Sequence, residues 1–137
     1  MNMATIFVSV LVWLQFKHFV ADYLLQPAWI LEGKGDFRKS GGYAHAGLHA
    51  CGSFPAFYLI GIDGTRLVVF AAFEFVVHYL IDHVKAVYSH NHPYAPRTFA
   101  FWALHGADQM LHHLTYSGLL LMIMVDASTL VAIPDPL

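Results

Sequence analysis

Residues 6–25 read IFVSVLVWLQFKHFVADYLL. This segment is predominantly apolar and has about the 20 residues that a helix needs to cross a bilayer. Its first seven residues carry one small hydroxyl, that of Ser9, whereas a helix on the surface of a soluble protein shows a polar stripe. A cleaved signal peptide is not expected, because the segment lacks a basic leader and is too long. The segment therefore predicts a transmembrane helix.

The composition of the whole chain favours the same class. Of the 137 residues, 58% are hydrophobic and 12% are charged, against about 25% charged in soluble domains. This balance excludes intrinsic disorder, and a net charge of −2 without a basic run excludes nucleic-acid binding. Cys51 is the sole cysteine, so a disulfide within the chain and a thiolate metal site are excluded. We expect Cys51 to be a packing residue.

Apolar segments separated by breaker residues predict four helices in one domain of residues 1–137. The expected bounds are 4–26, 43–62, 65–88 and 98–126, with a kink at Pro55 and a helix cap at Thr98. Residues 89–96 contain two prolines and predict a loop, and residues 133–137 are expected to fray. The fold class is an all-α integral membrane four-helix bundle of two hairpins. A soluble four-helix bundle is the alternative, and it would need many more charged residues.

Basic residues give the orientation of these helices. They gather in the loops that follow the first and third segments, where we find Lys34, Arg38, Lys39, Lys85 and Arg97, whereas the opposite side has Arg66. Loops rich in Lys and Arg stay cytoplasmic. The chain is therefore expected to be a multi-pass membrane protein with both termini on the non-cytoplasmic side.

Each predicted helix carries ionisable residues at spacings of three or four, which place side chains on one helix face. The four stripes are His18 and Asp22; His45 and His49; Glu74, His78 and Asp82; and His105, Asp108 and His112. Ionisable groups inside a membrane are costly and usually functional. The stripes occupy the ends of the first and third helices and the starts of the second and fourth. They should therefore converge in the cytoplasmic half.

The types of these side chains favour a metal site. All ten residues of the stripes are candidate ligands, and ten ligands are too many for one ion. Two divalent transition metal ions, with Zn, Mn, Fe or Co as candidates, are the usual arrangement for mixed His and carboxylate ligands. Three alternatives stay open: a network of neutralising pairs that fixes helix register, a haem site, and a path for protons or metal ions.

Several other polar residues have a candidate role. An anionic substrate could bind Lys34, Lys85 or Arg97, and Gln26 and Gln109 could orient the ligands. His83 and His113 lie one step off the stripes and are expected to point elsewhere. The roles of Lys17, His90 and His92 are left open.

The motifs together resemble a known family. They are His18-Phe-Val-Ala-Asp22-Tyr-Leu-Leu-Gln26, Lys34, His45-Ala-Gly-Leu-His49-Ala, His78-Tyr-Leu-Ile-Asp82-His-Val-Lys85 and Asp108-Gln109-Met-Leu-His112. Over roughly residues 11–115 the chain resembles the small bacterial membrane proteins classed as domain of unknown function 3307. The resemblance implies a multi-pass membrane protein with His, Asp, Gln and Lys signature positions, and no established reaction. A looser similarity is to integral-membrane proteins described as metal-dependent hydrolases.

These observations lead to one hypothesis and two alternatives. The hypothesis is a membrane hydrolase that cleaves a phosphoester or lipid-like ester with two metal ions. Its candidate catalytic residues are Asp22, Glu74, Asp108 and Lys85, and its expected partners are membrane lipids and a lipid-like or anionic substrate. A homo-oligomer is left open. The alternatives are a protein that binds or transports metal ions without catalysis and a structural or regulatory membrane module.

Overall fold

The computed structural model describes residues 2–62 and 64–131, and these residues form helices and connecting turns with no strand. The elements are α1 (Met3–Phe19), the π-helical turn η1 (Val20–Leu24), α2 (Ala28–Gly33), α3 (Ser40–Leu59), α4 (Gly64–Asn91) and α5 (Phe99–Val131). The predicted all-α class is therefore confirmed. The predicted frayed tail at residues 133–137 lies outside the described residues.

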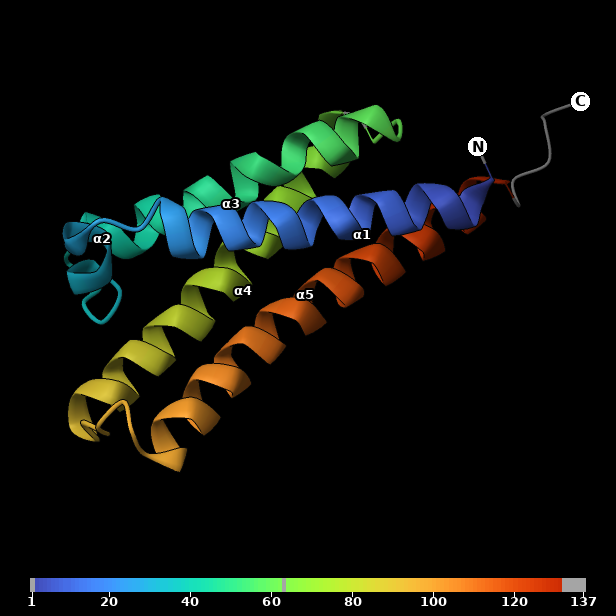
Figure 1. The fold of residues 1–137 in the computed structure, drawn as a ribbon. Helices are drawn as coiled ribbons and strands as arrows, with labels where there is room; N and C mark the ends of the chain where they lie inside the picture. Colours follow the sequence, from blue (N-terminus) through green and yellow to red (C-terminus); the bar gives the residue numbers. More distant parts are fainter. Residues whose placement is uncertain (1, 63, 132–137) are drawn as a thin grey trace, which may run out of the picture.

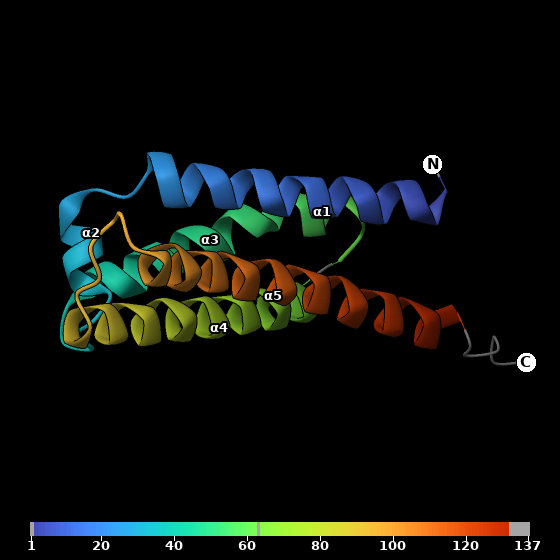
Figure 2. The same cartoon turned by 60° about the horizontal axis from the view of Figure 1, so that its bottom comes forward.

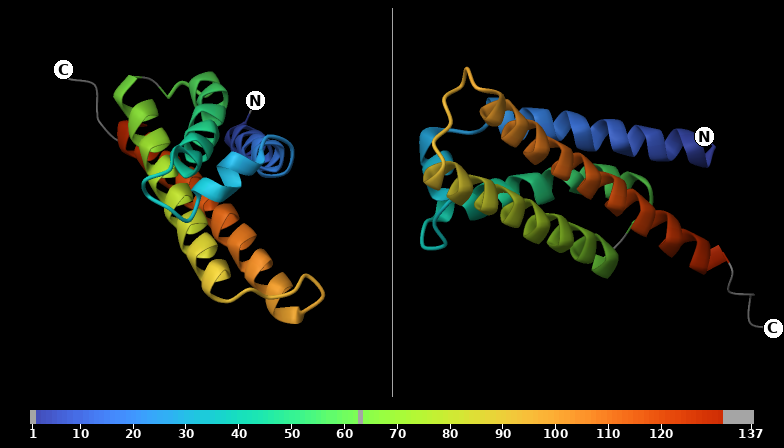
Figure 3. Two further views of the ribbon diagram at one scale, coloured as in Figure 1. Left: turned by 90° about the vertical axis from the view of Figure 1, so that its left-hand side faces the viewer. Right: turned by 90° about the horizontal axis from the view of Figure 1, so that it is seen from below.

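In Figure 1, α1 and α3 lie side by side as one pair of long helices, and α4 and α5 form a second pair that runs obliquely to them. The α3 helix packs against α4 and α1, and α5 packs against α4 and α1. Figure 2 shows the segment around α2 and the connection between α4 and α5 at one end of the molecule, with the start of α1 and the end of α5 at the other. Toward the loop end, α4 and α5 lean away from α1 and α3 as a pair (Figure 3).

Two of the helical segments are long and apolar enough to cross a membrane. They are Met3–Leu24, with a mean hydropathy of 1.6, and Gly64–Asn91, with a mean hydropathy of 1.7. Large apolar side chains are exposed along them, including Val12 at 58%, Phe16 at 59% and Val84 at 64%. Such a surface suits contact with lipid rather than with water.

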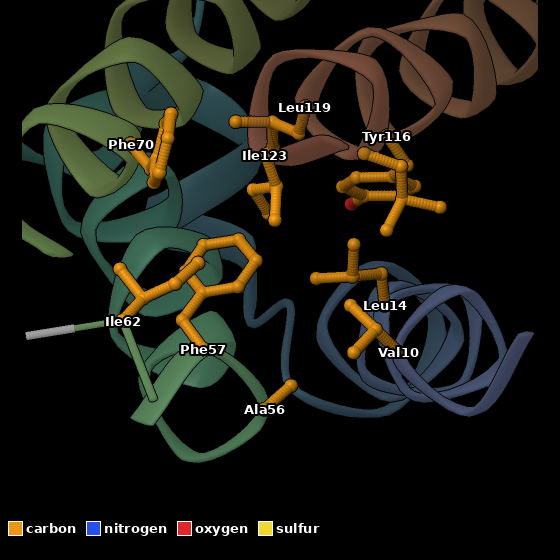
Figure 4. Packing of buried hydrophobic residues seen from close by; sticks show 10 residues of the cluster. Val10, Leu14, Ala56, Phe57, Ile62, Phe70, Tyr116, Leu119 and Ile123 are labelled. Carbon is orange, nitrogen blue, oxygen red and sulfur yellow. The ribbon is translucent and has the colours of Figure 1, made fainter. Parts of the chain in front are cut away.

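An apolar core fills the half of the molecule that lies away from α2. Figure 4 shows it, with side chains from α1, α3, α4 and α5 meeting between the helices. The core includes Val10, Leu14, Ala56, Phe57, Ile62, Phe70, Tyr116, Leu119, Leu120 and Ile123. These side chains are at most 9% exposed. Their packing holds the helices together in the region between the polar stripes and the chain termini.

The segment after α1 differs from the prediction. Pro27 was interpreted only as the end of the first helix. In the structure it lies at the N-terminal boundary of α2, a region of a helix where proline is well tolerated. The α3 helix begins at Ser40 rather than at residue 43. A Cβ at Gly41 would lie 2.5 Å from the backbone oxygen of Trp29. The absence of a side chain at Gly41 therefore permits α2 and α3 to touch.

Three smaller predictions also have an outcome. Thr98 caps α5, because its hydroxyl accepts a hydrogen bond from the backbone N–H of Phe101 at 3.3 Å. Pro55 lies inside α3. The prediction that Cys51 is a packing residue is wrong: its side chain is exposed, because it lies on the outer face of α3, between the inward-facing residues of that helix.

Candidate metal centre

Eight of the ten predicted ligands come together in three overlapping groups. Within each group the ligand atoms lie within 4.8 Å of one another. The groups are Asp22, His45, His49 and His78; His18, His78 and His112; and Asp82, Asp108 and His112. His78 on α4 belongs to two of them, and its ring stacks on His49 at 3.7 Å and on His112 at 4.2 Å between centroids. His78 is thus the centre of the cluster.

The first group is built around a carboxylate from η1 and two histidines from α3. Oδ1 of Asp22 lies 3.1 Å from Nε2 of His45 and 3.0 Å from Nε2 of His49. Both histidines are fully buried, at 0% exposure. The i, i+4 spacing on α3 directs both rings to the same carboxylate oxygen.

The third group, Asp82, Asp108 and His112, joins α4 and α5, and some buried polar atoms in and beside it lack a hydrogen bond. Nε2 of His112 lies 3.6 Å from Oδ1 of Asp82 and 3.8 Å from Oδ1 of Asp108. Nε2 of His78, Nε2 of His112 and Oδ1 of Asp108 are buried without a hydrogen-bond partner. Unpaired buried polar atoms are costly.

The spacing of these atoms suits a shared cation. Tetrahedral bonds of about 2.1 Å to one metal ion place the ligand atoms about 3.4 Å apart. The separations of 3.6 and 3.8 Å around His112 are too long for hydrogen bonds and close to that value. His and carboxylate ligands are also those that Zn, Mn, Fe and Co accept. The residues present therefore fit a metal ion.

Gln109 links the group that contains Asp22 to the group that contains Asp108. Its side-chain amide donates to Oδ2 of Asp22 and to Oδ2 of Asp108, each at 3.2 Å. With its N–H bonds used on the carboxylates, its oxygen accepts from Nε2 of His18 at 3.1 Å. Nδ1 of His18 then accepts from the hydroxyl of Tyr116 at 3.0 Å. Gln109 and Tyr116 thus orient the ring of His18 within the cluster.

Lysines neutralise part of the negative charge of the cluster. Nζ of Lys34 lies 2.9 Å from Oδ2 of Asp82, and Nζ of Lys85 lies 3.0 Å from Oδ2 of Asp108. Lys34 is buried at 8% exposure, so it does not stand at an open mouth as the sequence suggested. The side chain of Lys85 is 33% exposed and stays accessible from outside.

Two predicted ligands lie outside the three groups. Glu74 is fully buried, and its carboxylate pairs with Lys17 and accepts a hydrogen bond from Ser53. This pairing accounts for Lys17, whose ammonium also donates to the backbone oxygen of His49 at 2.8 Å. Because the carboxylate of Glu74 already has a lysine and a hydroxyl as partners, it needs no metal ion. The second of these residues, His105, is half-buried and contacts the hydroxyl of Tyr23 at 3.3 Å.

The remaining histidines and Gln26 make other contacts. Nδ1 of His83 contacts the backbone oxygen of Lys34 at 2.9 Å, and His92 stacks on Tyr88 at 4.4 Å. His113 is exposed, although its ring lies 5.7 Å from that of His18. Gln26 donates to the backbone oxygen of Asp22 at 2.9 Å, so it supports the backbone of this ligand rather than its carboxylate.

Sequence reasoning missed Tyr116 and Ser53. Both continue a stripe by one helical turn, because Tyr116 follows His112 by four residues and Ser53 follows His49 by four residues. The signal was therefore present as an i, i+4 extension. It was overlooked because neither residue is a common metal ligand.

Comparison with known proteins gives a family and no reaction. No curated protein and no solved structure matches the chain. The sequence model of one family, described as protein of unknown function (DUF3307), matches residues 10–134. This range includes every residue of the three groups and the supporting Gln109 and Tyr116. The chain belongs to the DUF3307 family.

Proposed function

We propose that the cluster is a dinuclear metal centre and that it hydrolyses an ester or phosphoester within the membrane. The observation that carries this proposal is the pair of unpartnered buried nitrogens, Nε2 of His78 and Nε2 of His112, because bound cations would satisfy both. The mixture of histidine and carboxylate ligands is the usual one for paired catalytic ions.

In this proposal the residues of the cluster have distinct roles. Asp22, His45, His49 and His78 would hold one ion, and Asp82 and His112 would hold the other. The ions would supply Lewis acidity and make a water molecule more acidic. The oxygen of that water would bond to the phosphorus or carbonyl carbon as the bond to the leaving alcohol breaks. Asp108 would accept the proton of the water at its free Oδ1, and Lys85 would bind the negative charge of the substrate. Gln109 would hold the carboxylates of Asp22 and Asp108 in fixed positions relative to each other.

The proposal is tested first by the metal content of the protein. We expect the purified protein to carry about two transition metal ions per chain. The variants His78→Ala and Asp82→Ala should carry fewer, and His92→Ala, an exposed histidine outside the cluster, should retain both. Elemental analysis measures the content. A screen of phosphoesters, carboxylesters and lipid esters with added Mn, Zn or Co, with and without chelator, then tests hydrolysis on the same preparation.

A second function has one observation in its favour. The buried carboxylates of Glu74, Asp82 and Asp108 each have a lysine partner, namely Lys17, Lys34 and Lys85. A structural module would use such pairs to hide charge and fix the helix register. Metal-free protein that is folded and equally stable in a chelator would support this function and contradict the metal centre. Metal flux into liposomes without turnover would instead support transport.

We also propose that the chain crosses the bacterial inner membrane several times with its basic loops in the cytoplasm. Single cysteines at Ser40 and Ser89, in a Cys51→Ala background, should then resist an impermeant thiol reagent in intact cells. A cysteine at Thr65, an exposed residue at the start of α4, should react. Labelling measured by gel shift checks the pattern, and the reverse pattern would place the metal centre in the outer half.

A further inference from the structure

A groove runs between the second half of α4 and the first half of α5. Its volume is about 690 Å³, within the roughly 300–1,000 Å³ of ligand pockets. Bulky apolar side chains form its walls, among them Leu80 and Leu111, and Ala103 and Ala107 lie on α5 within it. The pair of helices that borders it leans away from α1 and α3 (Figure 3).

The groove has one charged position. Lys85 and Asp108 are the acidic or basic residues that line it, and they pair across it at 3.0 Å. Oδ1 of Asp108 is buried without a hydrogen-bond partner and lies 3.8 Å from Nε2 of His112 in the cluster. Asp108 therefore belongs both to the groove and to the candidate metal centre.

The surroundings of the groove indicate where a ligand would enter. Val84 and Leu111 line it and are 64% and 49% exposed, so its rim continues into the apolar outer surface of the helices. In a membrane this rim would face lipid hydrocarbon, and an apolar chain could enter sideways from the bilayer. A water-soluble ligand would gain little from such walls, because they offer it apolar contact alone.

We propose that this groove binds the hydrocarbon chain of a membrane lipid that carries a phosphate ester, with the phosphate on Lys85 and the ester beside Asp108. The ammonium of Lys85 complements the phosphate charge, and charge-assisted contacts of this kind are among the stronger ones. This inference rests on the proposed hydrolase function and names its substrate class. It also gives a place for the substrate, which the cluster alone does not.

Photolabelling of the full chain in detergent tests the proposal without requiring turnover. The probe is lysophosphatidic acid with a diazirine in its acyl chain, and the reference is the monoacylglycerol with the same chain. The protein is treated with a chelator so that no hydrolysis occurs. We expect labelled peptides from residues 80–88 and 99–111, and about tenfold more labelling by the phosphate lipid than by the uncharged one.

Matched variants separate the chain contact from the charge contact. Ala103→Phe fills the groove and should abolish labelling by both lipids. Ala72→Phe places the same bulk at an exposed alanine of α4 that does not line the groove and should leave labelling unchanged. Lys85→Met should lower labelling by the phosphate lipid to the level of the monoacylglycerol, and Lys85→Arg should retain it.

Other outcomes would overturn the proposal. Labels spread over the outer faces of all helices, or labelling that Ala103→Phe does not change, would show nonspecific association of the probe with the apolar surface and no site. Equal labelling by both lipids would contradict the role of Lys85. Failure of the hydrolase proposal looks different, because a protein that labels as expected but shows no turnover retains the lipid site and lacks the catalysis.

Discussion

Replacing Asp108 by asparagine is expected to reduce hydrolytic turnover by about 10²- to 10⁴-fold, the usual contribution of a positioned general base. The amide keeps an oxygen near His112 and keeps the volume of the side chain, so most of the bound metal should stay. What the variant loses is the ability to accept a proton at the free oxygen. Initial rates with the best substrate of the screen, together with elemental analysis of the same sample, measure both quantities.

Glu32→Gln provides the matched control for this change. Glu32 is exposed and lies at the end of α2, so its conversion to the amide should alter neither rate nor metal content. If Asp108→Asn lost its metal together with its activity, Asp108 would be a ligand and not the base. If the variant kept both, the assignment of a base on α5 would be wrong.

A second large effect is expected at the buried pair of Lys17 and Glu74. Their side chains are 7% and 0% exposed, and removing one partner of a buried ion pair costs about 3–5 kcal/mol because the other charge stays unpaired. We therefore expect Lys17→Met to lower the free energy of unfolding by about that amount. The double variant Lys17→Met, Glu74→Met should recover most of the loss, since both charges are then gone.

A double-mutant cycle measured by denaturant unfolding in detergent gives the coupling energy of the pair. Lys39→Met, at an exposed lysine before α3, is the control for loss of a positive charge alone. A loss below about 1 kcal/mol for Lys17→Met, the range of surface ion pairs, would show that the pair is solvated. Glu74 would then become available again as a metal ligand.

Spacing along the chain was sufficient to predict which helix faces meet. The i, i+4 pairs His45 and His49, and His78 and Asp82, define single faces, and their positions near helix ends predict a common level. These parts of the cluster follow from helix geometry alone. Asp22 and both α3 histidines were expected at this common level, and their contact in the structure agrees with that.

The partner of each carboxylate could not be predicted in the same way. Lys17 is adjacent to His18 in sequence and therefore lies off its stripe, yet its long flexible side chain reaches Glu74 on α4. Pairing across helices depends on rotation and side-chain length, which local periodicity does not contain. The short helix α2 was missed for a related reason, since the glycine contact that permits it is a property of two segments together.

The π-helical turn η1 has a consequence for the length of the first helix. Its wide turn is closed by a hydrogen bond from the N–H of Leu25 to the oxygen of Val20 at 3.1 Å, and the side chain of Gln26 satisfies the oxygen of Asp22. Such a turn holds one residue more than a regular α-helical turn. Deleting one residue between His18 and Asp22 would rotate Asp22 by about 100° relative to α1, the angle of one residue in a helix of 3.6 residues per turn. The segment therefore acts as a spacer of fixed length, in which the count of residues is as constrained as their identity.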